Sequence, residues 1–397
     1  MSKPPRSTTD DLRGVSRLAV EATQGITALA KAVHQTIGSG PAALGRPLEV
    51  PTRAVTEVVY GGVSATTGLV GVGVDGALAA LGSLLPKTAP TREHEAVLAA
   101  LNGVLGDYLE ATGNPLTTSM IFRRGGVPLD LQRVPEPGPR LLLMVHGSSM
   151  NDLQWRRHGH DHGEVLAEAL AASRVDLLYN TGRHISDNGE DLAEALEALA
   201  RAWPGGIEEI VVVAHSMGGL VVRSACNYAE QNGHSWRARL GSIAFLGTPH
   251  HGAPLERAGN IVDLVLGATP YSAPFARLGK VRSAGVTDLR HATLRREDWE
   301  GRDRFARGAP PDVLRLPDGV DCYAIAGEVT KGVAGRLPGD GLVPVASALG
   351  RHADPERDLG LPDERVLVLP DTSHLDLLSS ADACEALRGW LAPQRSD

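Results

Sequence analysis

A serine stands where a buried strand is expected to turn sharply into a helix. Residues 210–220 run from an uninterrupted apolar stretch through Ala-His-Ser-Met-Gly-Gly into a helical pattern. Small residues at Ala214 and Gly218 let the strand and the helix pass closely, and a strained backbone at Ser216 would lift its hydroxyl above the sheet. Because such a hydroxyl can attack a carbonyl carbon, we predict that Ser216 is a nucleophile. The alternative is an ordinary glycine-flanked turn.

A serine hydroxyl needs a histidine to take its proton and a carboxylate to hold that histidine in the correct tautomer. Two downstream segments supply these residue types, Gly-Asp-Gly-Leu-Val-Pro around Asp340 and Ser-His-Leu-Asp-Leu-Leu around His374. Each follows a short apolar run, so each side chain is expected at the carboxyl end of a strand, where an open α/β sheet assembles its site. We predict Asp340 as the acid and His374 as the base. Asp371 and Asp376 are rival acids, and a turn aspartate and a surface histidine are the plainer alternatives.

The tetrahedral intermediate of acyl transfer needs two fixed N–H donors for its oxyanion. The apolar run 141–145 ends in His146 and Gly147, and this turn predicts that the backbone N–H groups of Ser148 and Met217 form the oxyanion hole. A strand followed by a simple glycine turn is the alternative. His215 is adjacent to the nucleophile and cannot face its hydroxyl productively. We therefore expect His146, Gly147, His215 and Gly218 to support the site.

Three histidines alternate in Trp-Arg-Arg-His-Gly-His-Asp-His-Gly, namely His158, His160 and His162. This spacing could present imidazoles together on an extended loop and bind zinc or another divalent ion. No second cluster with a metal-site spacing follows, so we expect that the histidines rim the site or cap a helix that starts near Asp161. We predict no metal and no cofactor.

The elements that must position these residues follow a βαβ pattern from residue 120 onward. Helical patterns such as 190–203 and 220–230 separate short apolar runs, which predicts a mainly parallel sheet covered on both faces. The predicted strands are 141–145, 175–179, 210–214, 243–246, 323–326 and 366–369. Residues 253–318 are too long for a simple crossover, so we expect them to form an insertion that acts as a lid or cap.

Residues 1–115 differ from the rest, and we assign them to a helical N-terminal region that precedes a catalytic domain over 116–397. Apolar residues recur at helical spacing over 15–37, residues 58–74 carry no charge but many glycines, and a third helical run covers 93–109. We expect these helices to be buried on the catalytic domain or against a second copy of the chain. Contact with a lipid surface is the alternative.

Composition excludes several classes of protein. The chain has 397 residues with 42% apolar and 22% charged residues, which is typical of a folded globular protein. Its formal charge is -8 and it lacks a long basic run, so we expect no nucleic-acid partner. The three cysteines, Cys226, Cys322 and Cys384, are odd in number and far apart, which indicates reduced core thiols. Without a secretory signal pattern at the N-terminus, we expect a cytoplasmic protein.

Five stretches occur in the order seen in lipases and esterases of the α/β-hydrolase superfamily, and residues 117–397 resemble that family. They are the strand before His146 and Gly147, Ala-His-Ser-Met-Gly-Gly, Phe-Leu-Gly-Thr-Pro-His-His-Gly-Ala, Gly-Asp-Gly-Leu-Val-Pro, and Ser-His-Leu-Asp-Leu-Leu. Ala214 replaces the usual first glycine, where small size matters more than an unusual dihedral angle. The resemblance implies an α/β-hydrolase fold and supporting roles for Thr248, Pro249, His250 and His251. Residues 179–189 also look like bacterial lipase-like proteins.

The predicted function is a serine hydrolase that cleaves carboxylic esters through an acyl-enzyme. Low aromatic content, the insertion and the apolar N-terminal helices favour lipid-like esters, as for a lipase or carboxylesterase. An acyltransferase or amidase with the same triad is an alternative. A non-catalytic α/β-hydrolase scaffold that binds lipid or protein partners is another, because a fold alone does not establish an activity.

Overall fold

The computed structural model describes residues 92–133, 137–253, 283–302, 311–329 and 339–392, together with Arg13 and Arg17. The chain divides into two compact units, one of Met1–Thr91 with Leu109–Thr117, the other of Arg92–Tyr108 with Thr118–Asp397. Apart from Arg17, the helices expected over 15–37 and 58–74 lie outside the described residues, as does the centre of the insertion, 254–282. No helix within the described ranges combines the length and the apolar character needed to cross a bilayer.

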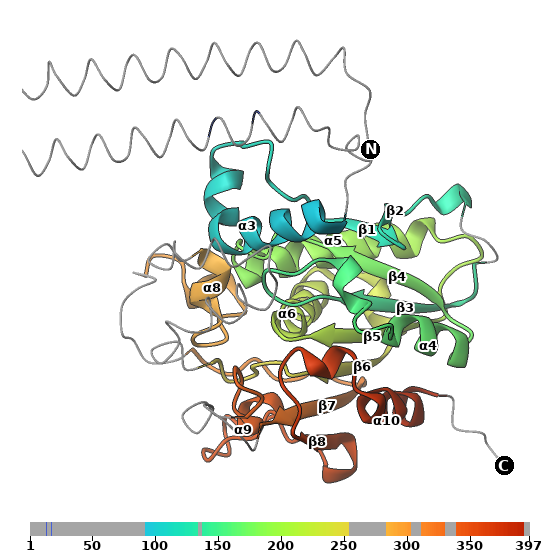
Figure 1. Cartoon of the computed structure of the whole chain (residues 1–397), viewed down its shortest axis with the longest axis vertical. Helices are drawn as coiled ribbons and strands as arrows, with labels where there is room; N and C mark the ends of the chain where they lie inside the picture. Colours follow the sequence, from blue (N-terminus) through green and yellow to red (C-terminus); the bar gives the residue numbers. More distant parts are fainter. Residues whose placement is uncertain are drawn as a thin grey trace, which may run out of the picture. The chain divides into compact units, whose positions relative to one another are not determined.

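The second unit contains one mixed sheet, whose strand order in the described residues is β2-β1-β4-β3-β5-β6-β7-β8. Its strands are β1 (Ile121–Arg124), β2 (Val127–Pro128), β3 (Arg140–Val145), β4 (Ser173–Leu178), β5 (Glu209–His215), β6 (Leu240–Leu246), β7 (Asp321–Glu328) and β8 (Val366–Pro370). Strand β1 is antiparallel to β2 and β4, and β3 to β8 are parallel. The six predicted strands are confirmed, and Figure 1 shows them stacked from β4 to β8.

Helices cover both faces of this sheet. The α-helices of the described residues are α3 (Arg92–Ala111), α4 (His162–Ala169), α5 (Ile185–Ala202), α6 (Met217–Asn232), α8 (Ala284–Asp288), α9 (Val345–Ala348) and α10 (Ala381–Leu391). Alternate residues of β3 enter different cores, because successive strand side chains point to opposite faces. Leu143 packs in the core shared with α5 and α6, whereas Leu142 and Met144 pack in the core shared with α4 and α10. Both layers needed to bury a parallel sheet are therefore present.

Helix ends follow local capping chemistry. The Asp161 carboxylate accepts hydrogen bonds from the backbone N–H groups of Gly163 and Glu164 at 2.9 and 3.3 Å, so α4 begins at His162. Of the two roles expected for the nearby histidines, capping this helix was wrong, because Asp161 supplies the cap. That they rim the site stays a prediction. Helix α10 begins after Ser380, whose hydroxyl accepts from the N–H of Ala383 at 3.2 Å.

The described parts of the 253–318 insertion pack on the start of α5. The buried Asp288 carboxylate of α8 accepts from the backbone N–H of Ile185 at 2.9 Å and lies 2.9 Å from Nδ1 of His184. The His184 ring also stacks on Trp299, with centroids 3.7 Å apart. These contacts anchor the insertion to the sheet domain, and its lid role remains a prediction.

Candidate active site

Ser216 occupies a sharp turn between β5, which ends at His215, and α6, which begins at Met217. Its backbone has φ 53 and ψ -125, a region that costs a residue with a side chain on the order of 1–3 kcal/mol. Two backbone hydrogen bonds hold the turn, from the N–H of Ser216 to the carbonyl of Leu246 at 2.8 Å and from the N–H of Gly219 to the carbonyl of Ser216 at 3.1 Å. The predicted elbow geometry is present, and Ser216 is partly exposed at its tip.

Small residues around the elbow are required by close approaches. A Cβ added at Gly218 would lie 2.6 Å from the carbonyl oxygen of His146, so the first turn of α6 rests directly on the end of β3. A Cβ at Gly147 would lie 3.0 Å from Cβ of Ser216. Ala214 is fully buried in β5 and does not need a positive φ, which explains why alanine is accommodated there.

The predicted acid and base form a buried pair. Nδ1 of His374 lies 2.7 Å from Oδ2 of Asp340, and the two residues are 4% and 2% exposed. Oδ1 of Asp340 accepts from the backbone N–H groups of Leu342 and Val343 at 2.9 and 2.8 Å, which fixes the carboxylate. Because an ionised carboxylate only accepts, His374 donates through Nδ1 and presents a lone pair on Nε2. This is the tautomer that a general base needs.

The rival acids have other positions. Asp371 is exposed and has φ 51, and Asp376 accepts a hydrogen bond from the Ser373 hydroxyl at 2.5 Å. The only hydrogen-bonding carboxylate at Nδ1 of His374 among the described residues is that of Asp340. The structure therefore brings the candidate base together with the predicted acid.

His215 connects the elbow to the segment that carries the candidate base. Its Nε2 lies 3.0 Å from the carbonyl oxygen of His374, and the two rings are 4.7 Å apart. Burial lowers the pKa of His215 well below its ordinary value, and the neighbouring His374 adds to this effect. His215 is therefore neutral and donates to that carbonyl, which positions His374.

The turn after β3 is fixed by a histidine and a tyrosine. Nδ1 of His146 lies 2.9 Å from the carbonyl oxygen of Gly147, and burial lowers the pKa of His146 to about 4, so a neutral ring donates this bond. Tyr179 donates to the carbonyl of His146 at 2.8 Å and stacks on its ring. In a trans peptide the C=O and the following N–H point in opposite directions. Holding the Gly147 carbonyl therefore sets the direction of the Ser148 N–H.

The Gly-Thr-Pro-His stretch after β6 packs beneath the elbow. A Cβ at Gly219 would lie 2.2 Å from Oγ1 of Thr248, so this threonine contacts the first turn of α6. His250 is buried, and Nη1 of Arg223 lies 3.2 Å from its Nδ1. Burial lowers the pKa of His250 well below its ordinary value, with Arg223 as the second cause, so the imidazole is neutral and accepts from the guanidinium.

Sequence reasoning did not identify several residues that shape the site. Tyr179 holds the β3 turn, Thr181 accepts from the backbone N–H of Ser149 at 3.0 Å, and Arg223 holds His250. The similarity of residues 179–189 to lipase-like proteins marked this region without assigning roles. Arg223 carries no signal, because its contacts arise only when α6 is packed.

The fold and the site together define the class of this protein. The described residues have the features of the α/β-hydrolase fold. These are the parallel strands β3 to β8, helices on both faces of the sheet, a positive-φ serine after β5, and an Asp-His pair beyond β7 and β8. The predicted fold class is confirmed.

Comparisons with known proteins gave one family match and several similar structures. Residues 118–292 match a family described as a domain of unknown function, DUF7379. No curated protein matches the sequence. The chain is similar to the mature lipase BlEst2 of Bacillus licheniformis, with 16% identity, 69% of this chain and 98% of that chain covered, and a TM-score of 0.44. It is also similar to YbtT, the type II thioesterase of a yersiniabactin pathway, with 16% identity, coverages of 66% and 97%, and a TM-score of 0.39. For the esterase Pf2001 of Pyrococcus furiosus the identity is 14%, the coverages are 64% and 82%, and the TM-score is 0.37.

Proposed function

We propose that the protein is a serine hydrolase that cleaves carboxylic esters. The observation that carries this proposal is the strained Ser216 elbow on the same sheet edge as the buried Asp340–His374 hydrogen bond of 2.7 Å. A non-glycine residue at positive φ is costly, and such strain is concentrated at functional sites. The buried, fully hydrogen-bonded Asp340 holds His374 in one tautomer, which is what a serine nucleophile requires of its acid and base.

The proposed acylation step uses each group once. Nε2 of His374 takes the proton of the Ser216 hydroxyl while the oxygen attacks the ester carbonyl carbon. The oxyanion accepts hydrogen bonds from the backbone N–H groups of Ser148 and Met217. When the intermediate collapses, the bond to the alcohol oxygen breaks, and His374 returns its proton to that oxygen.

Deacylation repeats these steps with water as the nucleophile. His374 takes a proton from water, the hydroxide attacks the acyl carbon, and the bond to Ser216 breaks as the serine oxygen regains the proton. The acid is released. These steps need no metal or cofactor, and we propose that none takes part.

For the substrate class we propose lipid-like esters, supported by the low aromatic content and by the long insertion beside the sheet. An acyltransferase would use the same acyl-enzyme with an alcohol in place of water, and an amidase would use the same nucleophile on an amide. A non-catalytic scaffold is the remaining alternative. We also propose a cytoplasmic location, which the three unpaired, buried cysteines support.

The decisive experiment combines covalent labelling with turnover. We expect a fluorophosphonate probe to label Ser216, and Ser216→Ala to lose labelling and about three or more orders of magnitude of ester turnover with an unchanged circular dichroism spectrum. A panel of p-nitrophenyl esters of increasing chain length, with and without added alcohols, separates hydrolysis from acyl transfer. Undiminished labelling of the alanine variant would refute the nucleophile, and a folded protein without labelling would favour the scaffold.

A further inference from the structure

A cluster of three residues that could bind a metal, two histidines and one cysteine, lies outside the proposed mechanism. Nitrogen atoms of His160 and His162 and the sulfur of Cys384 all lie within 4.8 Å of one another. His160 precedes α4, His162 is the first residue of α4, and Cys384 is the fourth residue of α10. The cluster therefore joins segments that are more than two hundred residues apart in the sequence.

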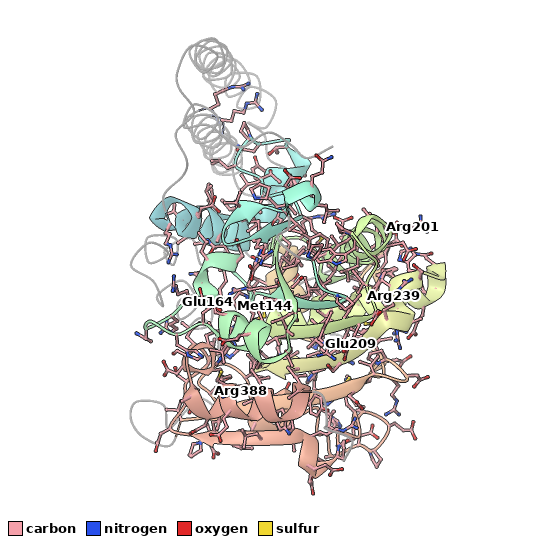
Figure 2. The ribbon with its side chains drawn as sticks, turned by 90° about the vertical axis from the view of Figure 1, so that its right-hand side faces the viewer. Met144, Glu164, Arg201, Glu209, Arg239 and Arg388 are labelled. Carbon is pink, nitrogen blue, oxygen red and sulfur yellow. The ribbon has the colours of Figure 1, made fainter. Side chains whose placement is uncertain are left out.

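The two helices that carry the cluster pack against each other on one face of the sheet. Figure 2 looks onto this face, where Glu164 marks α4 and Arg388 marks α10. His162 and Cys384 are buried and His160 is half-buried, so solvent reaches the cluster from the His160 side. An ion could enter without unfolding of either helix.

The orientation of His162 is that of a metal ligand. Its Nε2 lies 2.8 Å from the carbonyl oxygen of Leu377, so Nε2 carries the proton and Nδ1 presents a lone pair toward His160. A ligating histidine almost always donates its other N–H to a carbonyl or carboxylate, which fixes the tautomer and the ring. Leu377 supplies that carbonyl here.

We propose that His160, His162 and Cys384 bind one zinc ion, with the fourth tetrahedral position open to water. Two imidazoles and one thiolate, with water in the fourth position, are a ligand set that zinc accepts, and zinc itself has no redox chemistry. Nε2 of His160 now lies 2.8 Å from Nδ1 of His162, whereas two zinc-bound nitrogens stand about 3.3 Å apart. A small rotation of the half-buried His160 provides that separation.

The proton balance of binding follows from these contacts. The N–H that His160 directs at His162 moves to the other nitrogen of the His160 ring, so the imidazole stays neutral. Cys384 loses its thiol proton to solvent as the zinc–sulfur bond forms, so one proton is released for each ion bound. Burial raises the pKa of the Cys384 thiol, and Arg388 on the same helix offsets this only in part, so the bond to zinc itself must stabilise the thiolate.

The ion would brace the segment that carries the candidate base. Its ligand His162 holds the carbonyl of Leu377, and the Leu377 side chain lies 3.0 Å from the position of a Cβ at Gly247, beside His374 and Asp340. The alternative is that the His160–His162 hydrogen bond and the buried thiol only fill this corner of the core.

Cobalt titration of the untagged full-length chain distinguishes a zinc site from a cluster that only fills the core. After chelator treatment, we expect one equivalent of Co²⁺ to give a thiolate-to-metal charge-transfer band, which Zn²⁺ then removes by displacement. Cys384→Ala should abolish the band, and His160→Gln should weaken zinc affinity at least about tenfold, since even outer partners of a ligand cost 10–100-fold. His158→Gln and Cys322→Ala are matched controls and should bind as the parent does.

The experiment measures the affinity for zinc and the absorption spectrum of the cobalt-bound protein, so its outcome does not depend on ester turnover. Absence of stoichiometric cobalt or zinc binding by the folded parent would overturn the proposal. Equal zinc affinity in the parent and in His160→Gln would do the same. If Cys384→Ala fails to fold, His160→Gln still decides, because the His160 side chain is half-buried and lies before the helix.

Discussion

Asp340→Asn should remove the catalytic tautomer of His374 while preserving the shape of the site. In the parent, one carboxylate oxygen accepts from the N–H groups of Leu342 and Val343, and the other accepts from Nδ1 of His374. An asparagine has only one oxygen. If that oxygen keeps the two backbone donors, the NH₂ group faces Nδ1 of His374.

The consequence for His374 is a forced change of tautomer. Nδ1 must then accept from the amide, so the ring proton moves to Nε2, and Nε2 can no longer take the proton of Ser216. A variant of this kind in a triad lowers kcat about 10⁴-fold. We expect a loss of that order for Asp340→Asn, with KM nearly unchanged because the carboxylate does not touch the substrate.

The assay is kcat for a short p-nitrophenyl ester, with thermal unfolding measured in parallel. Asp371→Asn is the matched control, because it changes an exposed aspartate three residues from the same histidine, and it should retain activity within about twofold. Asp340→Ala should in addition destabilise the fold, since it leaves two buried N–H donors without an acceptor, at about 1–3 kcal/mol each. A folded Asp340→Asn protein with kcat within tenfold of the parent would refute the reasoning.

Three further predictions concern the surroundings of the triad. Gly247→Ala should lower kcat at least about tenfold, because its Cβ would lie 3.1 Å from Oδ2 of Asp340 and from Cε1 of His374; Gly360→Ala, at a similar positive φ with open space around it, should keep full activity. His146→Phe should lower kcat about tenfold by freeing the Gly147 peptide, and an unchanged kcat would remove His146 from the oxyanion turn. Because the folded-state pKa of His146 is lowered to about 4, its stability contribution is complete above about pH 6.5 and is lost as pH falls toward 4. Unfolding measurements should therefore show that the parent loses about 2 kcal/mol more than His146→Phe between pH 7 and pH 5.

The strands were predictable because buried parallel strands are continuous apolar runs with breaks at both ends. The short hairpin of β1 and β2 was not predicted, because it carries Arg123. That arginine is buried with ion pairs to Glu95 and Asp152, each at 3.0 Å, and both partners are distant in sequence. A charged residue inside a four-residue strand breaks the apolar pattern, so the strand cannot be predicted from the sequence without knowing which residues pair with that charge.

Helix α5 begins at Ile185, five residues before the predicted start at 190. The first turns contain Ser, Asp, Asn and Gly, which favour loops in sequence. Packing overrides this preference at Gly189, where a Cβ would lie 2.2 Å from Oγ of Ser224 on α6. The glycine lets the two helices cross closely, and the buried contact compensates for its low helix propensity.

The sequence alone led to the candidate triad, because strand ends and chain order limit where the three residue types can meet, and the triad stays a prediction. The choice of Asp340 over its rivals followed the same logic, and the hydrogen bond to His374 agrees with it. Cys384 could not be paired with His160 and His162 from spacing, since metal-site patterns in sequence depend on ligands that are close along the chain. Only the packing of α10 against α4 brings the thiol to the histidines.

The segment that carries His374 is held by three hydrogen bonds, which would keep the candidate base in one position. Its backbone N–H donates to the carbonyl of Asp340 at 3.0 Å, and its own carbonyl accepts from His215 beside the nucleophile at 3.0 Å. Three residues later, the carbonyl of Leu377 accepts from His162 at 2.8 Å. Two of these three anchors are buried histidines whose pKa values burial lowers, so both donate as neutral rings at neutral pH. Protonation would not remove these N–H donors but would place charge in the core, so acid should loosen the base through destabilisation of its supports rather than through loss of a hydrogen bond.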